Sequence, residues 1–301
     1  MAYRVEFEFS PLYELANSLD LFLNRKSMKH VELGQEWIIN AEQSLELSGL
    51  SIGNTKELPC LSYLFLLIWQ SPEKEEVQPF IKWLHSLQPG SIYEKLFPYI
   101  SAPLPTDLLT IRDQYIELIK VWDTIYFSKL NPDITDALRE SVLVKEKLYY
   151  EDPISYVEQI SGGLRIEAYE GLEQVIMIPT YHTNPLIVSR KLKNTVQILY
   201  PIDLPEGEHA PPKKLVRLTK ALADENRLKI LKLVYKNPMT FTEILQYFDV
   251  SKSTVHHHVM LLRTAGLISA YHTGECCSET FVYRPTGMDE LTTVFMGFME
   301  N

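Results

Sequence analysis

The stretch SKSTVHHHVMLLRTAGLI, residues 251–268, decides how the last third of this 301-residue chain folds. At 100° per residue, Val255, Val259 and Leu262 fall within a stripe about 60° wide on one face of a helix. This apolar stripe predicts the face that packs on a core. The remaining faces carry polar side chains, and these are Lys252, Ser253, Thr254, His256, His257 and Arg263.

The three consecutive histidines do not predict a metal site. Their side chains fan out over about 200° at the helical period, so they cannot converge on one ion. Two ligands on one helix face need a spacing of four residues, but Met260 follows His256 and Leu262 follows His258 at that spacing. No nucleophile or paired acid stands at a catalytic spacing. We therefore name no catalytic or cofactor-binding residue and expect neither a bound metal nor a cofactor.

Helices are predicted before this stretch over residues 213–223, 224–236 and 239–248. Asp224 is placed to cap the second helix, and Thr240 and Glu243 form a capping box at the start of the third. The residues 249–251 then turn the chain into the helix 252–264. A short helix, a tight turn and a second capped helix make a helix-turn-helix.

Two strands are predicted after this motif, at about Ile268–His272 and Thr280–Tyr283. A helix-turn-helix followed by such a hairpin is a winged helix. The final segment, 288–300, is amphipathic, with an apolar stripe from Leu291 to Phe298. This stripe either forms a dimer interface or covers the core of the winged helix, and the sequence leaves both possibilities open.

The polar faces of the helix 252–264 suit the groove of a nucleic acid. Their donors can reach base edges and phosphates, and the positive N-terminus of a helix favours phosphate oxygens. The six polar residues of this helix are therefore candidate DNA contacts. On the wing, Glu275 and Glu279 would repel phosphate, which leaves His272 and Arg284 as the candidate contacts there.

Residues 213 to about 300 resemble the ArsR/SmtB family of bacterial transcriptional regulators. The resemblance is carried by LADENRLKILKLV, by TFTEILQYFDVSKSTVHHHVMLLRTAGLI and by the wing ending VYRP. It implies a dimeric DNA-binding domain with the helix 252–264 in the major groove, contacts from Lys252, Ser253, Thr254, His256 and His257, and a scaffold role for His258. It also implies dimerisation through the first and last helices of the domain.

Metal sensing is not carried over from this family. Residues 240–248 contain no cysteine and residues 287–301 contain no histidine, where the family's metal sensors have ligands. The adjacent thiols of Cys276 and Cys277 could sense oxidants, but nothing basic flanks them and Glu275 would raise their pKa, which favours an inert pair. With Cys60 they form no disulfide framework, and this cysteine usage indicates a reducing cytoplasm.

The first 204 residues predict a separate domain, followed by a proline-rich linker at 205–212 and the winged helix at 213–301. Most of this first domain shows helical spacing. YRVEFEF, LRIEAY, QVIMIPT and TVQILYP are the candidate strands of a small antiparallel sheet. The fold class is thus α+β and mainly helical. The four tryptophans of this domain either fill its core, which we favour, or line an effector pocket.

The formal net charge of −10 is unevenly distributed. Residues 212–301 carry 11 Lys/Arg and 9 Asp/Glu, against 18 and 30 upstream, so an acidic partner would approach the C-terminal part. No secretory signal and no membrane-spanning run are evident, and we expect a cytoplasmic protein.

Together these patterns predict a transcriptional regulator, expected to be a repressor. It would bind a double-stranded DNA operator as a homodimer and respond to an unknown small-molecule or protein effector. The alternative is a winged helix that binds other proteins without DNA, which the modest charge of +2 keeps open. An enzymatic N-terminal domain has the least support, because no phosphate loop or nucleophile motif is found.

Overall fold

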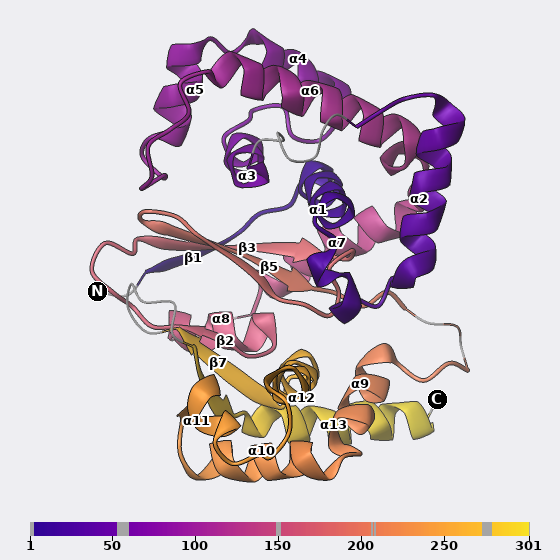
Figure 1. Cartoon of the computed structure of the whole chain (residues 1–301), viewed down its shortest axis with the longest axis vertical. Coiled ribbons are helices and arrows are strands. Elements are labelled where there is room, and N and C mark those ends of the chain that lie inside the picture. The colour runs from indigo at the N-terminus through magenta and orange to yellow at the C-terminus, as the bar shows by residue number, and fades with distance from the viewer. Residues whose placement is uncertain are drawn as a thin grey trace. The chain divides into compact units, whose positions relative to one another are not determined.

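A computed structural model of the chain describes residues 3–52, 60–148, 152–205, 207, 209–272 and 279–300. The chain divides into two compact units (Figure 1). Residues 6–147 and 173–202 form the first, here called the sheet unit. Residues 203–301, with 1–5 and 148–172, form the second, here called the winged-helix unit. The segment 148–172, which the sequence assigned to the N-terminal domain, is thus grouped with the winged helix.

The sheet unit contains seven α-helices and two short 3₁₀ helices within its described residues: α1 (Pro11–Leu23), η1 (Arg25–His30), α2 (Gly34–Ser48), α3 (Leu61–Trp69), α4 (Val77–Ser86), α5 (Pro89–Leu96), α6 (Leu108–Ile125), η3 (Phe127–Lys129) and α7 (Pro132–Lys145). Several of these helices begin at a side-chain cap. Ser10 accepts a hydrogen bond from the Leu12 amide ahead of the first-turn Pro11, and Asp107 accepts one from Thr110.

Four strands form a sheet in the order β1-β3-β5-β4. They are β1 (Arg4–Phe7), of which residues 6–7 belong to the sheet unit, β3 (Gln174–Thr180), β5 (Thr195–Pro201) and β4 (Val188–Lys191). The N-terminal strand lies beside β3, as the sequence predicted. The expected antiparallel arrangement is wrong for the central pair, because β3 and β5 are parallel, whereas β4 and β5 are antiparallel. The chain passes from β3 to the outer position of β4 and returns through a hairpin, which inserts β5 beside β3.

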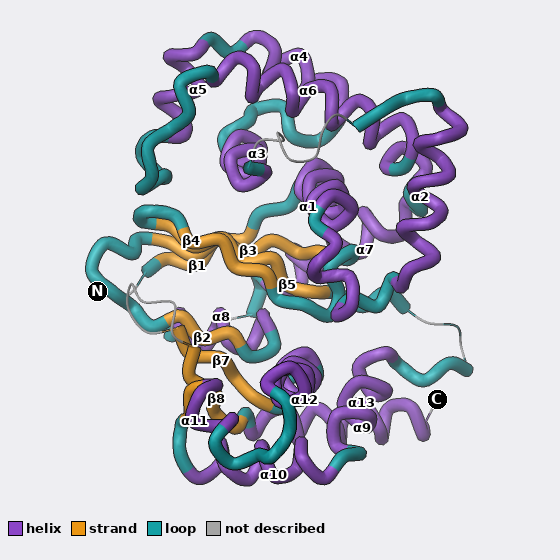
Figure 2. Tube along the Cα trace, in the orientation of Figure 1, coloured by secondary structure: helices purple, strands orange, loops and turns teal. Residues whose placement is uncertain are grey.

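Helices cover both faces of this sheet (Figure 2). Ile176, Ile178 and Leu199 belong to the main hydrophobic cluster with α1 and α3. On the opposite face the hydroxyl of Tyr200 lies 3.2 Å from that of Ser141 on α7. A strand buried on both faces is apolar throughout rather than alternating, which explains the run QVIMIPT.

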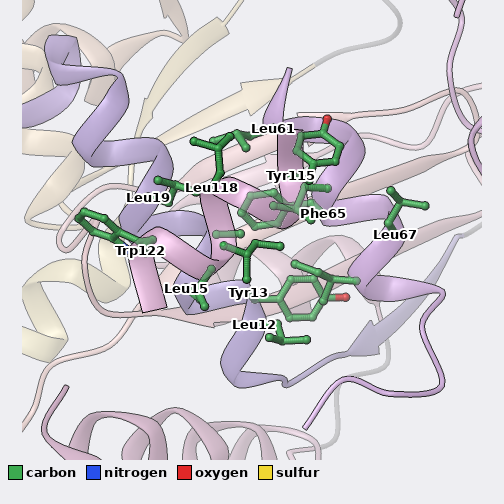
Figure 3. Close-up of a cluster of buried hydrophobic side chains, with 14 of the residues drawn as sticks. Leu12, Tyr13, Leu15, Leu19, Leu61, Phe65, Leu67, Tyr115, Leu118 and Trp122 are labelled. Carbon is green, nitrogen blue, oxygen red and sulfur yellow. The ribbon is translucent and has the colours of Figure 1, made fainter. Parts of the chain in front are cut away.

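The core of the sheet unit gathers side chains from α1, α3 and α6 (Figure 3), together with strand residues such as Ile178 and Leu199. Trp122 and Tyr115 from α6 are fully buried against α1 and α3. Trp37 belongs to the same cluster, and Trp69 and Trp83 pack against it as partly buried side chains. All four tryptophans therefore contribute to packing.

The winged-helix unit contains α8 (Pro153–Ser161), β2 (Leu164–Ile166), α9 (Lys213–Leu222), α10 (Glu225–Lys236), β6 (Met239–Thr240), α11 (Phe241–Leu245), α12 (Lys252–Thr264), β7 (Ile268–His272), β8 (Glu279–Tyr283) and α13 (Pro285–Glu300). Its sheet has the order β2-β7-β8-β6. The predicted hairpin of β7 and β8 is confirmed. The placement of LRIEAY in the N-terminal sheet is wrong, because β2 pairs in parallel with β7, with Leu164 opposite Ala270.

Candidate nucleic-acid interface

The helix α12 is held in place by its apolar stripe. Val255 and Leu262 are fully buried and Val259 is nearly so. The helix begins at Ser251, whose hydroxyl accepts a hydrogen bond from the Thr254 amide at 3.2 Å. The capping box that starts α11 is also present, with Thr240 and Glu243 bonded to each other's amides. The sequence therefore determined this motif through local caps and one buried stripe.

The outer face of α12 is exposed to solvent. Lys252, Ser253, His256 and His257 are all exposed, and Thr254 is half-buried. The ring of His256 also contacts Phe241 of α11, with 5.9 Å between ring centroids. Five of the predicted contact residues thus lie in the N-terminal half of α12, and four of them are exposed.

His258 faces the interior instead. It is 7% exposed, and its Nδ1 lies 3.8 Å from the Asp224 carboxylate that caps α10. Burial lowers the pKa of His258, and the nearby Asp224 offsets only part of this effect. His258 is therefore a scaffold residue, as the resemblance implied. Over the residues that the structure describes, no group of three or more His, Cys, Asp or Glu side chains could hold a metal ion.

Two further predicted contacts, Arg263 and His272, meet at Glu279 of the wing. Arg263 Nη1 lies 3.0 Å and 3.1 Å from the two Glu279 oxygens, and His272 Nε2 lies 2.9 Å from Oε1. Burial would raise the pKa of Glu279, but the hydrogen bond with His272 and the charge of Arg263 outweigh it, so the pKa is lowered. The negative charge of Glu279 is thus balanced by contacts within the protein. The predictions for Glu275, Cys276 and Cys277 lie outside the described residues.

The prediction that Arg284 contacts DNA is wrong. Its side chain is 3% exposed. Its guanidinium donates to the Gly266 carbonyl at 3.0 Å, to Gln159 Oε1 at 3.1 Å and to Glu290 Oε1 at 2.9 Å. Arg284 therefore joins α8, the turn after α12 and the start of α13, and its guanidinium is buried rather than presented to solvent.

Sequence reasoning missed the residues of α8 that contact the wing. Glu158 accepts a hydrogen bond from the buried Ser269 hydroxyl on β7, and its second oxygen lies 3.4 Å from Arg165. Gln159 accepts from Arg284, 125 positions further along the chain. Nothing local in the sequence signals a contact between residues 125 positions apart.

The helix α13 leaves much of its apolar side uncovered. Within it only Gly287 is buried, whereas Phe295 is 46% and Phe298 37% exposed. Met296 and Met299 are exposed as well. The apolar stripe from Leu291 to Phe298 is therefore not fully buried in the core of the winged helix.

With this geometry, the match to a known family can be placed. Residues 224–270, from the cap of α10 to β7, match the family described as "Bacterial regulatory protein, arsR family". The C-terminal region of the chain is an ArsR-family winged helix-turn-helix.

The chain is similar to the transcriptional repressor SdpR of Bacillus subtilis (strain 168), with 38% identity over 56 residues. This match covers 19% of the chain and 62% of SdpR, so the chain spans less than two thirds of that relative. A solved ArsR-like transcriptional regulator from Rhodococcus sp. RHA1 is similar at 17% identity, over 29% of this chain and 80% of that chain, with a TM-score of 0.26. Reduced HlyU from Vibrio cholerae N16961 is similar at 26% identity, over 28% and 83%, with a TM-score of 0.22.

The family match is confined to residues 224–270, within the winged-helix unit. None of the helices within the described ranges is long and apolar enough to cross a lipid bilayer.

Proposed function

We propose that this protein is a DNA-binding transcriptional regulator that reads an operator with α12. The observation that carries this proposal is the division of α12 into two faces. Val255, Val259 and Leu262 anchor one face, which leaves the face with Lys252 and His257 exposed over the N-terminal half of the helix. Such a helix can enter the major groove without moving any buried side chain.

We assign the exposed residues to two kinds of DNA contact, to phosphates and to base edges. Lys252 and the amides at the N-terminus of α12 suit phosphate oxygens, whereas Ser253 and His257 suit base edges. Arg263 and His272 are engaged with Glu279, so we assign them to positioning the wing against α12 rather than to direct contact.

We propose a homodimer built through α9 and α13. The exposed Phe295, Met296, Phe298 and Met299 form an apolar surface on one helix, which a second copy would bury. A two-fold axis would place two copies of α12 about 34 Å apart, in successive major grooves of a two-fold symmetric operator.

We propose that the regulator is a repressor and that the sheet unit provides its signal input, from a cytoplasmic small molecule or protein. The segment 148–172 supports this, because it follows and precedes residues of the sheet unit yet pairs with the wing. The amide of Glu167 donates to the His272 carbonyl at 3.1 Å, and the side chain of His272 contacts Glu279. A coupling of about 1 to 3 kcal/mol between such a segment and DNA binding is sufficient for regulation.

The alternative function is a winged helix that binds proteins without DNA. It is favoured by exposed apolar side chains on the outside of the domain, notably Leu228, Tyr235 and Tyr247. In vitro selection of DNA by the full chain, repeated at several salt concentrations, separates the two. A regulator should enrich a sequence and lose affinity steeply as salt rises, because phosphate contacts release counterions. A protein-binding module should enrich no sequence at any salt concentration.

A further inference from the structure

Two polar side chains lie next to each other on the buried face of the sheet in the sheet unit. Arg190 on β4 lies directly opposite Gln197 on β5, which in turn lies opposite Ile176 on β3. The neighbouring row on the same face reads Val188, Leu199 and Ile178, all part of the hydrophobic core or packed against it. Directly opposed side chains on one sheet face lie close together, so the two polar groups are neighbours in an apolar setting.

Arg190 is a buried cation whose charge is incompletely compensated. Its side chain is 10% exposed, and its Cζ lies 3.6 Å from the centroid of the Phe65 ring. Its Nη2 is 3.5 Å from the Asp20 carboxylate, which is longer than a charge-assisted hydrogen bond, and its buried Nη1 has no hydrogen-bond partner. Asp20 also accepts a hydrogen bond from Asn24 at 2.6 Å. Burial lowers the pKa of Arg190 to about 10, so it remains charged at neutral pH.

Gln197 is fully buried, and neither its amide nitrogen nor its amide oxygen has a hydrogen-bond partner. Leaving a buried polar group unsatisfied is unfavourable, and buried amides are nearly always paired. An unpartnered guanidinium donor therefore stands beside an amide whose donor and acceptor both lack a partner.

We propose that Arg190 and Gln197 bind the carboxylate of a small monocarboxylate ligand. One carboxylate oxygen would accept from Arg190 Nη1 and a carboxylate oxygen would accept from Gln197 Nε2, so that each unsatisfied donor gains an acceptor. A ligand with one negative charge is expected, because the site has one guanidinium and Asp20 already compensates part of its charge. The surroundings of the pair are apolar, because Ile176 and Leu199 belong to the hydrophobic core and the Phe65 ring lies against the Arg190 guanidinium.

The suggestion that this ligand is the signal of a regulator rests on the proposed function. Binding of the carboxylate itself requires no DNA. The two proposals therefore fail separately, since ligand binding is measured on the free protein.

The test is calorimetric titration of the full chain with sodium butyrate, with sodium phosphate as a second probe and sodium chloride at equal ionic strength as the baseline. Butyrate should bind saturably and raise the melting temperature, whereas phosphate should bind more weakly. An absence of saturable butyrate binding overturns the proposal. Phosphate that binds as tightly as butyrate overturns the assignment to monocarboxylates.

Three variants locate the site. Arg190→Met and Gln197→Leu should each weaken butyrate binding at least about tenfold, the loss expected for a hydrogen bond to a charged group. Lys191→Met, an exposed lysine on the other side of β4, should leave the affinity unchanged. Without ligand, Gln197→Leu should melt above the wild type, because an apolar side chain replaces an unsatisfied amide; this shows that the variant folds. Wild-type affinity in Arg190→Met and Gln197→Leu would refute the site.

Discussion

Arg263 and Glu279 form an ion pair that joins α12 to the wing. A single nitrogen, Arg263 Nη1, lies 3.0 Å and 3.1 Å from the two carboxylate oxygens of Glu279. His272 contacts the same carboxylate from the neighbouring strand β7. The Glu279 carboxylate on β8 therefore links the proposed recognition helix to both strands of the wing. Residues that read in the sequence as independent contacts or repulsive charges act here as one cluster.

The variant Glu279→Gln should loosen the wing in a pH-dependent way. The lowered pKa of Glu279 in the folded state means that its ionised form stabilises the fold above the unfolded pKa, about 4.3. That contribution is lost as the pH falls through the folded pKa. We expect the variant to be about 1 kcal/mol less stable at pH 7 and to approach the wild type below about pH 4. Hydrogen exchange of β7 and β8 amides measures this, and Asp289→Asn, an exposed carboxylate on α13, serves as the control. A pH-independent difference would exclude the ion pair as its cause.

His257→Ala should reduce specific DNA binding more than non-specific binding. His257 is exposed on the face of α12 opposite its buried stripe, where a side chain reaches base edges. Loss of a base contact weakens the selected site by about 1 to 3 kcal/mol, roughly 5- to 150-fold. Lys252→Ala should instead weaken both kinds of DNA similarly and lower the salt slope by about 1. Equal losses in His257→Ala on both kinds of DNA would refute base reading.

The sequence predicted those parts of the fold whose causes are local. The start of α12, the capping box at Thr240 and the hairpin of β7 and β8 all depend on residues within a few positions of each other. The parallel pairing of β3 with β5 arises because the connection 181–187 leads to the outer strand β4, which leaves the position beside β3 for β5. A run such as QVIMIPT does not indicate which strand will lie beside it. The burial of Arg284 is of the same kind, because its partner Gln159 comes from a distant segment. An arginine at the end of a wing strand reads as exposed unless α8 is known to cover it.

Arg284→Met should impair folding of the winged-helix unit rather than the electrostatics of DNA binding. Removal of the guanidinium leaves Glu290 paired with Lys214, and it leaves the Gly266 carbonyl and Gln159 without the donor that Arg284 supplied. Breaking a buried ion pair on one side costs about 3 to 5 kcal/mol. Urea unfolding should show a loss of this order, whereas the salt slope of residual DNA binding should match the wild type. A reduced slope with normal stability would return Arg284 to the DNA contacts.

Phe295→Glu should convert the proposed dimer to a monomer. The substitution places a charge in the exposed apolar surface of α13, which a second copy would have to bury. Light scattering after size-exclusion chromatography measures the mass. Leu228→Glu is the matched control, because Leu228 is similarly exposed, at 49%, but lies on α10. A dimer in both variants would place the interface elsewhere.

Two glycines of α13 should respond to alanine in opposite directions. A Cβ at Gly287 would lie 2.3 Å from the Gly266 carbonyl oxygen and 3.2 Å from Leu267 Cα, both backbone atoms that cannot rotate away. Gly287→Ala should therefore push the start of α13 off the turn after α12 and destabilise the winged-helix unit by about 2 kcal/mol or more. At Gly297 a Cβ meets nothing within 4 Å, so Gly297→Ala should stabilise the helix by about 0.5 to 1 kcal/mol. Urea unfolding of both variants tests the close packing of α13 on this turn, and a Gly287→Ala protein as stable as the wild type would show that this contact does not hold the helix.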